Sequence, residues 1–513
     1  MALAPYFSKA GLGAAALMQD MGCDRLASLV EPLAVRIAFG PDAVQSPEGR
    51  VLLELTVNLL ARFYPTLQFA PEGPGADAHA ASLQDLARSI NPEIDFRGPD
   101  DRTPCIAVGN VRPVRDTFCV YVGSKDWVAH VSTQSARTLG TSANPFGAGA
   151  AACIGTAFVF RHLFHEQLGV PAPDQELSLS MASYDVGRRR STGTALDRDL
   201  GVVALVGAGA IGNAAVWGLA RTQATGDLHV IDGEVVDDTN PQRYVLTAAA
   251  DVRTQKVALA ARHLAGTRLT VHQHAMSWAN FVTATNHDCP PLVACALDTA
   301  EDRCAVQSSL PEMILNAWTQ PGDVGISRHE FLGKSACLAC LYWPRTQRKN
   351  FDELVKEAIR YSGELMEVRD MLYLRTPLDD AWLDRLSADM GVVRATLTPF
   401  RNKTLDEFYR EGICGGHVMA VRGAKVVVPM AFQSAFAGLM LAAEIIKTAP
   451  THKLKADMVT TKIDLLRPIG TRLSEAANKT ADIRCICRDP IYVRRYEQKY
   501  PHRTRHAPAH DGR

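Results

Sequence analysis

The chain has 513 residues, and its 55 Lys plus Arg are balanced by 55 Asp plus Glu, so the formal net charge is zero. This balance gives no electrostatic reason to expect nucleic acid or an anionic membrane as a partner. The length predicts two or three domains. Twelve cysteines in so long a chain do not indicate a secreted disulfide scaffold, so we expect a cytoplasmic protein in which some cysteines bind a metal.

Residues 1–185 have the pattern of one α/β domain without a nucleotide-binding motif. Leucines at helical spacing predict a helix over Arg50–Tyr64, and a second helix, rich in Ala and Gly, starts at Pro145. Short apolar runs between the two helices predict strands at Cys105–Val108, Phe118–Val122 and Trp127–Val131. The polar stretch that follows marks the domain boundary, which we place in a linker over residues 186–200.

The next segment is the one around which the chain is organised. An apolar, partly β-branched run is followed by Gly207, Gly209 and Gly212, then by a helical pattern and a second apolar run that ends at Asp232. Strand, glycine turn, helix, strand and acid is the order of a dinucleotide-binding βαβ unit. The glycines let a phosphate approach the helix N-terminus, and the acid can accept hydrogen bonds from a ribose. The motif does not distinguish NAD from ATP, and an empty Rossmann-like core is the alternative.

Strand and helix patterns alternate through this second domain, residues 201–487, and predict a mostly parallel, doubly wound sheet. A charged helical segment over 345–412 has the character of an insertion, and residues 488–513 that of a flexible basic tail. The helices after Pro145 and Pro429 are loosely alike, which suggests a duplication whose first copy lost its glycine loop. The other expected elements are strands at Leu269–Val271, Leu292–Ala296, Met313–Asn316, Lys425–Val428 and Asp457–Leu465, and helices over Thr254–Leu264 and Met430–Lys447.

Asn240, Arg243, Lys256 and Asp298 follow Asp232 along the chain. Asp298 comes directly after an apolar strand, and an acid at the carboxyl end of a parallel strand lies where ligands bind. A hydride-transfer enzyme has little use for these cations, whereas an enzyme that breaks a nucleoside triphosphate needs cations to neutralise charge and an acid to hold magnesium. Each residue taken alone is better explained as a surface charge, but together, in this order, they favour a catalytic site.

Cysteine spacing predicts a metal site. Cys337 and Cys340 form a CxxC pair, and Cys485 and Cys487 form a CxC pair near the end of the chain. Two short pairs from distant segments can close a tetrahedral structural zinc site, with unrelated buried or surface thiols as the alternative. Cys414 stands apart, followed by two glycines, and is either a reactive thiol or a small buried apolar residue.

These segments together resemble the ThiF/MoeB-like superfamily, which includes the ubiquitin-activating enzymes. Where members of this family usually continue asparagine–arginine–glutamine, this chain has Gln242-Arg243-Tyr244. The resemblance extends over about 201–490 and is carried by GAGAIG at 207–212, Asp232, TNPQRY at 239–244, Lys256, LDTAEDR with Asp298 and Arg303, CLAC at 337–340, and ICGGHV followed by the Pro429 helix.

The resemblance implies a fold with two Rossmann-like adenylation-type domains, of which the N-terminal one, residues 1–185, is inactive. In the active domain, Asp232 would bind the ribose of ATP and Asp298 the Mg2+ ion, while the phosphates would be bound by Asn240, Arg243 and Lys256. The zinc ion would be held by Cys337, Cys340, Cys485 and Cys487. Cys414 would lie where members that form a thioester or persulfide place their cysteine.

The resemblance also implies a function: ATP-dependent activation of a ubiquitin-like protein with a C-terminal glycine. Adenylation would come first, then thioester transfer to Cys414 and hand-over to a conjugating enzyme. By analogy alone we also expect a homodimer and a place in a bacterial conjugation system with an antiviral role. The alternative is a sulfur-carrier-protein or small-substrate adenylyltransferase that forms no protein thioester. A degenerate scaffold and an NAD-dependent oxidoreductase are the rivals from other classes.

Overall fold

The computed structural model describes residues 23–97, 102–112, 117–187, 195–320, 323–342, 351–409, 429–448, 459–470, 473–482 and 484–504, together with residues 4, 7, 14, 18 and 412. The chain divides into two compact units. The larger unit comprises Met1–Phe7, Val30–Trp343 and Pro429–Arg513, and the smaller one comprises Ser8–Leu29 and Pro344–Val428.

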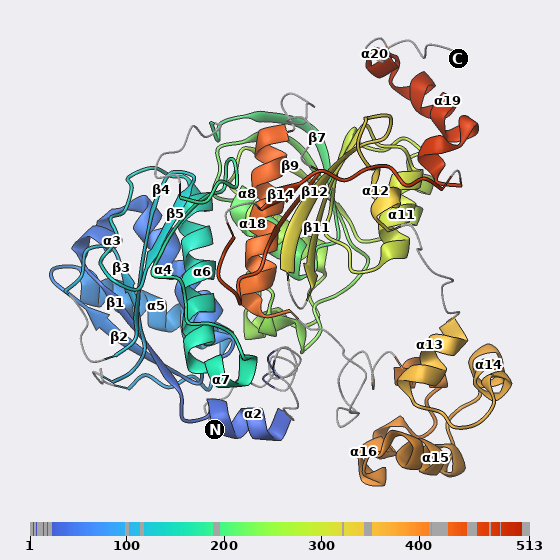
Figure 1. The fold of residues 1–513 in the computed structure, drawn as a ribbon, viewed down its shortest axis with the longest axis horizontal. Helices are drawn as coiled ribbons and strands as arrows, with labels where there is room; N and C mark the ends of the chain where they lie inside the picture. Colours follow the sequence, from blue (N-terminus) through green and yellow to red (C-terminus); the bar gives the residue numbers. More distant parts are fainter. Residues whose placement is uncertain are drawn as a thin grey trace. The chain divides into compact units, whose positions relative to one another are not determined.

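The first sheet of the larger unit has six strands in the order β2-β1-β3-β4-β5-β6 (Figure 1). The first four strands in that order are parallel, and the last two continue antiparallel. The helices predicted at Arg50 and Pro145 and the three predicted strands are confirmed. In chain order the elements are β1 (Ala34–Phe39), α3 (Pro41–Gln45), α4 (Pro47–Ala61), β2 (Thr66–Pro71), α5 (Ala76–Ile90), β3 (Cys105–Val108), β4 (Cys119–Lys125), β5 (Val128–Ser132), α6 (Pro145–Leu163), α7 (His165–Leu168) and β6 (Glu176–Ser180).

The second sheet has eight strands in the order β14-β13-β12-β11-β10-β7-β8-β9. It is parallel from β9 to β11 and antiparallel from β11 to β14, so four of its seven strand pairings have the predicted parallel direction. Its elements are β7 (Asp199–Val206), α8 (Ala210–Leu219), β8 (Thr225–Ile231), η1 (Asn240–Gln242), η2 (Ala249–Asp251), α9 (Lys256–Leu264), β9 (Leu269–His274), α10 (Trp278–Ala284), β10 (Leu292–Cys295), α11 (Ala300–Ser308), β11 (Met313–Gln320), β12 (Asp323–Glu330), α12 (Leu338–Leu341), α18 (Ala431–Thr448), β13 (Thr460–Ile463), β14 (Ser474–Glu475), η5 (Ile486–Arg488), α19 (Pro490–Lys499) and α20 (Pro501–Thr504).

Six strands of the second sheet repeat the pattern of the first. The order β8-β7-β10-β11-β12-β13 shows the same three parallel and two antiparallel pairings as β2-β1-β3-β4-β5-β6. In both sheets a helix follows the first central strand, and a long apolar helix joins the two antiparallel strands next to the parallel ones. This repetition is what a duplicated domain predicts.

Four helices, α4, α6, α8 and α18, pack between the two sheets (Figure 1). Helix α6 begins at Pro145 because Asn144 caps it, accepting a hydrogen bond from Phe146 N at 2.9 Å. Small residues bring the helices close: a Cβ on Gly149 would lie 2.8 Å from the Leu439 side chain of α18. Of the described helices, only α6 is long and apolar enough to cross a membrane, but 89% of that stretch is buried, as in a core helix.

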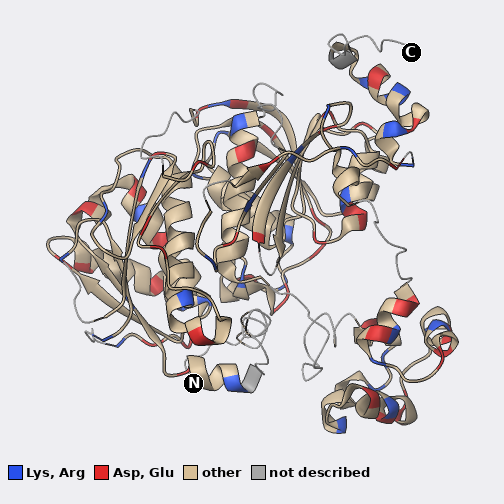
Figure 2. Ribbon diagram, viewed as in Figure 1, with Lys and Arg blue, Asp and Glu red and all other residues tan. Residues whose placement is uncertain are grey.

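The smaller unit is helical, as the sequence predicts for the charged segment 345–412. A separate apolar core of residues such as Leu383, Leu386 and Phe408 holds its helices together. Lys, Arg, Asp and Glu alternate over the outside of these helices (Figure 2), with ion pairs such as Arg394–Asp380 at 2.7 Å. The helices of this unit are α2 (Cys23–Val30), α13 (Phe351–Ala358), α14 (Leu365–Tyr373), α15 (Asp380–Met390), α16 (Arg394–Leu397), η3 (Thr398–Phe400) and α17 (Leu405–Glu407).

For its described part, residues 488–504, the structure corrects the prediction of a flexible tail over 488–513. Residues 490–499 form α19, which Asp489 caps by accepting a hydrogen bond from Ile491 N at 2.7 Å. Tyr496 is buried on its inner face and donates a hydrogen bond to the Glu312 carbonyl at 3.0 Å. Arg494 and Arg495 lie on the exposed side of this packed helix. The strand predicted at Lys425–Val428 lies outside the described residues.

Candidate functional site

The glycine turn between β7 and α8 cannot carry side chains at two of its positions. Gly207 has φ +91°, and a Cβ there would lie 2.6 Å from the Ala296 carbonyl oxygen at the end of β10. A Cβ on Gly212 would lie 1.9 Å from the Gly207 carbonyl oxygen. Gly209 is the N-cap residue of α8 and has no side chain to cap it, so the first N–H groups of the helix are left for another partner.

Two acids flank this turn, because the parallel strands β8, β7 and β10 end at one edge of the sheet. Asp232, just beyond β8, accepts hydrogen bonds from Ala208 N and from Glu234 N, both at 2.8 Å. Its carboxylate therefore fixes the glycine turn as well as facing the edge. Asp298, just beyond β10, is exposed, as an acid that binds a metal must be before the metal arrives.

Two cations meet at the same edge around the ring of Tyr244. The Lys256 Nζ lies 5.4 Å and the Arg243 Cζ 5.5 Å from the centre of this buried ring. Lys256 opens α9 and forms an ion pair with Glu234. Burial alone would lower the pKa of Lys256, but Tyr244, Glu234 and Asp232 together raise it, so the side chain stays protonated. The edge thus keeps a fixed positive charge.

The chain between Asp232 and Lys256, which carries Asn240 and Arg243, forms only the short helices η1 and η2. Asn240 is buried at the start of the short η1, and its side-chain oxygen accepts a hydrogen bond from Asp237 N at 3.3 Å. Farther along, Leu246 N donates to the Asn213 side chain of α8 at 2.7 Å. The segment is therefore tied to the helix that starts at the glycine turn.

Arg303 secures the loop that carries Asp298. Its guanidinium donates to the carbonyl of Asp298 at 3.3 Å and to the carbonyl of Leu297. It also donates to the Asn316 side chain on β11 at 3.0 Å. This arginine therefore fixes the backbone that presents the acid.

The four cysteines predicted to bind metal come together. Their Sγ atoms all lie within 4.8 Å of one another, and five of the six separations are between 3.5 and 3.8 Å. Thiolates about 2.3 Å from a tetrahedral zinc ion are about 3.8 Å apart, so this group fits one such ion. Thr480 N donates a hydrogen bond to the Cys340 sulfur at 3.4 Å, which stabilises a thiolate there.

Two family models match separate parts of the chain. Residues 199–485 match the ThiF family, and this match spans more than half of the chain. The chain belongs to the ThiF family. The uncharacterized protein y4jF of Sinorhizobium fredii is 38% identical over 507 residues, which is 98% of this chain and 98% of that protein. Residues 38–165 match a different family, Prokaryotic E2 family C.

Solved structures of E. coli MccB are also similar to this ThiF-family chain. The complexes with ATP and with succinimide align at 15% identity, with TM-scores of 0.34 and 0.33. The alignments cover 56% and 55% of this chain and 67% and 65% of MccB, so this chain spans about two thirds of the MccB length.

The residues of the ThiF domain fit the ATP and Mg2+ that enzymes of this family use. Arg243 Nη1 and Gln242 Nε2 are buried and have no hydrogen-bond partner among the described residues, so both are available to an anion. Asp298 offers the hard oxygen ligand that Mg2+ prefers. Cys414 lies outside the described residues, and its predicted role stays a prediction.

The sequence analysis missed two side chains of the first sheet that reach this site. Asn58 and Arg62, at the end of α4, both hydrogen-bond to backbone carbonyls between residues 241 and 247. Their signal in the sequence is slight: two polar residues four apart in an otherwise leucine-rich helix. Asn213 was also missed, because a buried Asn in a helix has many ordinary explanations.

Proposed function

We propose that this ThiF-family protein adenylates the C-terminal carboxylate of a ubiquitin-like protein with Mg-ATP. The observation that carries the proposal is the sheet edge at Gly207, where an uncapped helix N-terminus, two acids, the buried Lys256 and the unpaired Nη1 of Arg243 come together. Phosphate, ribose and magnesium each find a suitable partner at this edge. An NAD-binding site would not need Arg243 and Lys256 there.

In the proposed reaction, a carboxylate oxygen of the substrate forms a bond to the α-phosphorus of ATP. The bond from that phosphorus to the α,β-bridging oxygen breaks, and pyrophosphate leaves with the bond electrons. Arg243 and Lys256 neutralise the charge that develops on the phosphates. Asp298 would hold Mg2+, which supplies further neutralisation of the leaving group.

In the second proposed step, the Cys414 thiolate attacks the acyl carbon of the adenylate, and AMP leaves. The thioester then passes to a conjugating enzyme. The match of residues 38–165 to an E2 family raises the alternative that a thiol of that segment takes the acyl group. Its three cysteines, Cys105, Cys119 and Cys153, are all buried. Hydrogen bonding to Cys105 and burial raise the pKa of Cys119, and burial raises that of Cys153, which opposes thiolate formation in either.

We further propose that the first sheet belongs to an inactive adenylation-type domain. Its strand pairing repeats that of the ThiF domain, and its first long helix, α4, begins behind a capped, proline-containing turn in place of a glycine loop. We also propose that the four clustered cysteines bind one structural zinc ion.

The test of the first step is ATP–pyrophosphate exchange with a ubiquitin-like protein that ends in glycine. Asp298→Ala should lower the exchange rate on the order of 100-fold or more, because the metal ligand is lost. Asp288→Ala is the matched control, since Asp288 is an exposed acid at the opposite end of β10. Equal exchange in the two variants would reject the magnesium role of Asp298.

The test of the second step is a comparison of reducing and non-reducing electrophoresis after incubation with ATP and the modifier. Cys414→Ser should still form the adenylate but should lose the reducible adduct. A reducible adduct that persists in Cys414→Ser and disappears in Cys119→Ser would assign the thioester to the segment that matches the E2 family. The absence of any adduct in the wild type, with exchange intact, would favour an adenylyltransferase without a protein thioester.

A further inference from the structure

Two residues at the end of α4, in the domain that lacks the glycine loop, hydrogen-bond to residues 241–247 of the ThiF domain, which we call the nucleotide segment. Arg62 is 1% exposed. It donates hydrogen bonds to the carbonyl of Pro241 and, at 3.0 Å, to the carbonyl of Thr247. Asn58, which accepts from Arg62 Nε at 3.0 Å, donates to the carbonyl of Val245 at 2.9 Å. Two side chains thus bind three carbonyls of residues 241–247.

These bonds matter because most of the segment's other hydrogen bonds are local, from Arg243 N and Tyr244 N to Asn240 O and from Thr247 to Tyr244 O. A longer-range bond joins the Leu246 carbonyl to His263 of α9. The segment is in neither sheet, and its only regular element is the single turn η1. Opposite the grip, Asn213 of α8 accepts a hydrogen bond from Leu246 N. The segment is therefore held between α4 and α8. A fully buried guanidinium is costly, and an apolar side chain would fill the same space, so the use of Arg62 indicates that the position of these carbonyls is important.

Arg243 and Tyr244 lie inside the gripped segment. The Tyr244 ring is the surface around which Arg243 and Lys256 meet, and a Cβ on Gly209 would lie 3.4 Å from its hydroxyl. A shift of the Pro241–Thr247 backbone would therefore move one cation and the platform of the other relative to the helix N-terminus. Displacements of about 1 Å are enough to cost a large factor in rate.

We propose that Arg62 is a positioning residue of the nucleotide site, through which the N-terminal domain sets the geometry of Arg243 and Tyr244. Asn58 supports it. The N-terminal domain is then a working part of the site even though it carries no glycine loop of its own. The expected effect of Arg62 on the reaction rate rests on the proposed adenylation. Its expected effect on the backbone of residues 241–247 does not.

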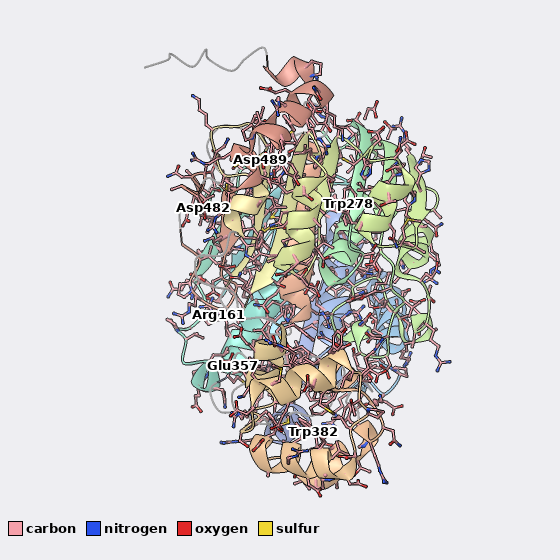
Figure 3. The ribbon with its side chains drawn as sticks, turned by 90° about the vertical axis from the view of Figure 1, so that its right-hand side faces the viewer. Arg161, Trp278, Glu357, Trp382, Asp482 and Asp489 are labelled. Atoms are coloured by element: carbon pink, nitrogen blue, oxygen red, sulfur yellow. The ribbon has the colours of Figure 1, made fainter. Side chains whose placement is uncertain are left out.

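The chain offers a matched control in Arg161 (Figure 3), which is likewise fully buried and belongs to the same domain. Arg161 donates to the carbonyls of Pro171, Ala172 and Arg467 and also forms an ion pair with Asp174 at 3.3 Å. None of these partners is near the glycine turn in sequence. Arg62→Met and Arg161→Met each remove one buried guanidinium from backbone carbonyls. Both should lower Tm, but only Arg62→Met should affect the nucleotide segment.

The experiment measures three quantities on the full chain. In Arg62→Met, amide hydrogen exchange of residues 241–247 should become faster, and the Kd of a non-hydrolysable ATP analogue should rise about tenfold. The exchange of ATP with pyrophosphate should fall on the order of 100-fold. Arg62→Lys, which can reach one carbonyl, should recover part of the affinity. Arg161→Met should match the wild type in all three.

Equal hydrogen exchange and equal affinity in Arg62→Met and Arg161→Met would overturn the inference. A wild-type protein that neither binds the analogue nor exchanges pyrophosphate would reject the proposed function instead. Hydrogen exchange of residues 241–247 would then still decide whether Arg62 controls the segment. If Arg62→Met does not fold, Asn58→Ala, which removes the bond to Val245 and the acceptor of Arg62 Nε but keeps the guanidinium, should give the same changes at smaller size.

Discussion

The two sheets of the larger unit share a strand pattern, but the first long helix after the first central strand, α4 in one domain and α8 in the other, begins in opposite ways. In the ThiF domain, the glycine turn leaves the start of α8 uncapped. In the N-terminal domain, Ser46 caps α4 by accepting from Gly49 N at 3.1 Å, and Pro47 has no N–H to offer. Glu48 then places a fully buried carboxylate in the first turn of this helix.

The surroundings of Glu48 show how completely that turn is closed. Its carboxylate accepts hydrogen bonds from Ser124 Oγ at 2.5 Å, from Asp126 N at 3.1 Å and from Ser142 Oγ at 2.7 Å. A helix N-terminus favours an anion, and here the chain supplies its own. The comparison teaches that the sheet alone does not make an ATP site, because nucleotide binding depends on leaving that place open.

The largest effect should come from the four clustered cysteines of the ThiF domain. Cys340→Ser removes a thiolate from the proposed zinc site, where metal binding would contribute directly to folding, so we expect a loss of several kcal/mol and a fall in Tm of about 10 °C or more. Elemental analysis should show about one zinc per wild-type chain. Cys304→Ser is the control, because this neighbouring cysteine is outside the group of four. Equal Tm values would contradict a zinc role.

A side chain added to the glycine turn before α8 tests whether nucleotide binding depends on that turn. Gly207→Ala places a methyl group 2.6 Å from the Ala296 oxygen, at a φ of +91°. The strain costs about 1–2 kcal/mol, and the displaced turn should slow pyrophosphate exchange on the order of 100-fold. Gly201→Ala is the control, since Gly201 also has a positive φ, +60°, but nothing within 4 Å of a Cβ. If both variants exchange at the wild-type rate, the tight turn is not needed for nucleotide binding.

Opening the closed turn should cost stability without creating a second site. Glu48→Gln replaces an acceptor with an amide N–H2 that faces the same donors, so we expect a loss of about 1–3 kcal/mol in the free energy of unfolding. Chemical denaturation measures this loss, and calorimetry with an ATP analogue should show an unchanged stoichiometry. A gain of a second nucleotide per chain would contradict the view that the N-terminal domain lacks the remaining parts of a site.

The smallest effect is expected at the ion pair between Glu54 of α4 and Arg221, which lies just after α8. Glu54 of α4 pairs with Arg221 and accepts from Trp217 Nε1 at 3.4 Å, but its side chain is 39% exposed. Glu54→Gln should therefore cost less than about 1 kcal/mol by chemical denaturation. A loss as large as that of Glu48→Gln would show that this partly exposed ion pair stabilises the protein as much as the buried carboxylate does.

The sequence was sufficient for the parts of the molecule that rest on local patterns. The glycine turn, the acid at Asp232 and the helices after Pro145 and Pro429 each follow from spacing within a short segment, and the cysteine pairs from ligand chemistry. The grip of Arg62 could not be predicted, because its partners lie 179 and 185 residues away. Helix α19 was missed because its basic residues suggest solvent, whereas burial of Tyr496 decides its packing.

The presence of both sheets on one polypeptide has a consequence for how such a protein can change over time. In a symmetric pair of identical chains, every substitution appears twice and must suit both copies. Here α4 and α8 are encoded separately, so Arg62 could specialise in holding the Pro241–Thr247 segment while Arg221, just after α8, pairs with Glu54. Substitutions at Arg62 are then expected to accompany changes in residues 241–247 and not in α8.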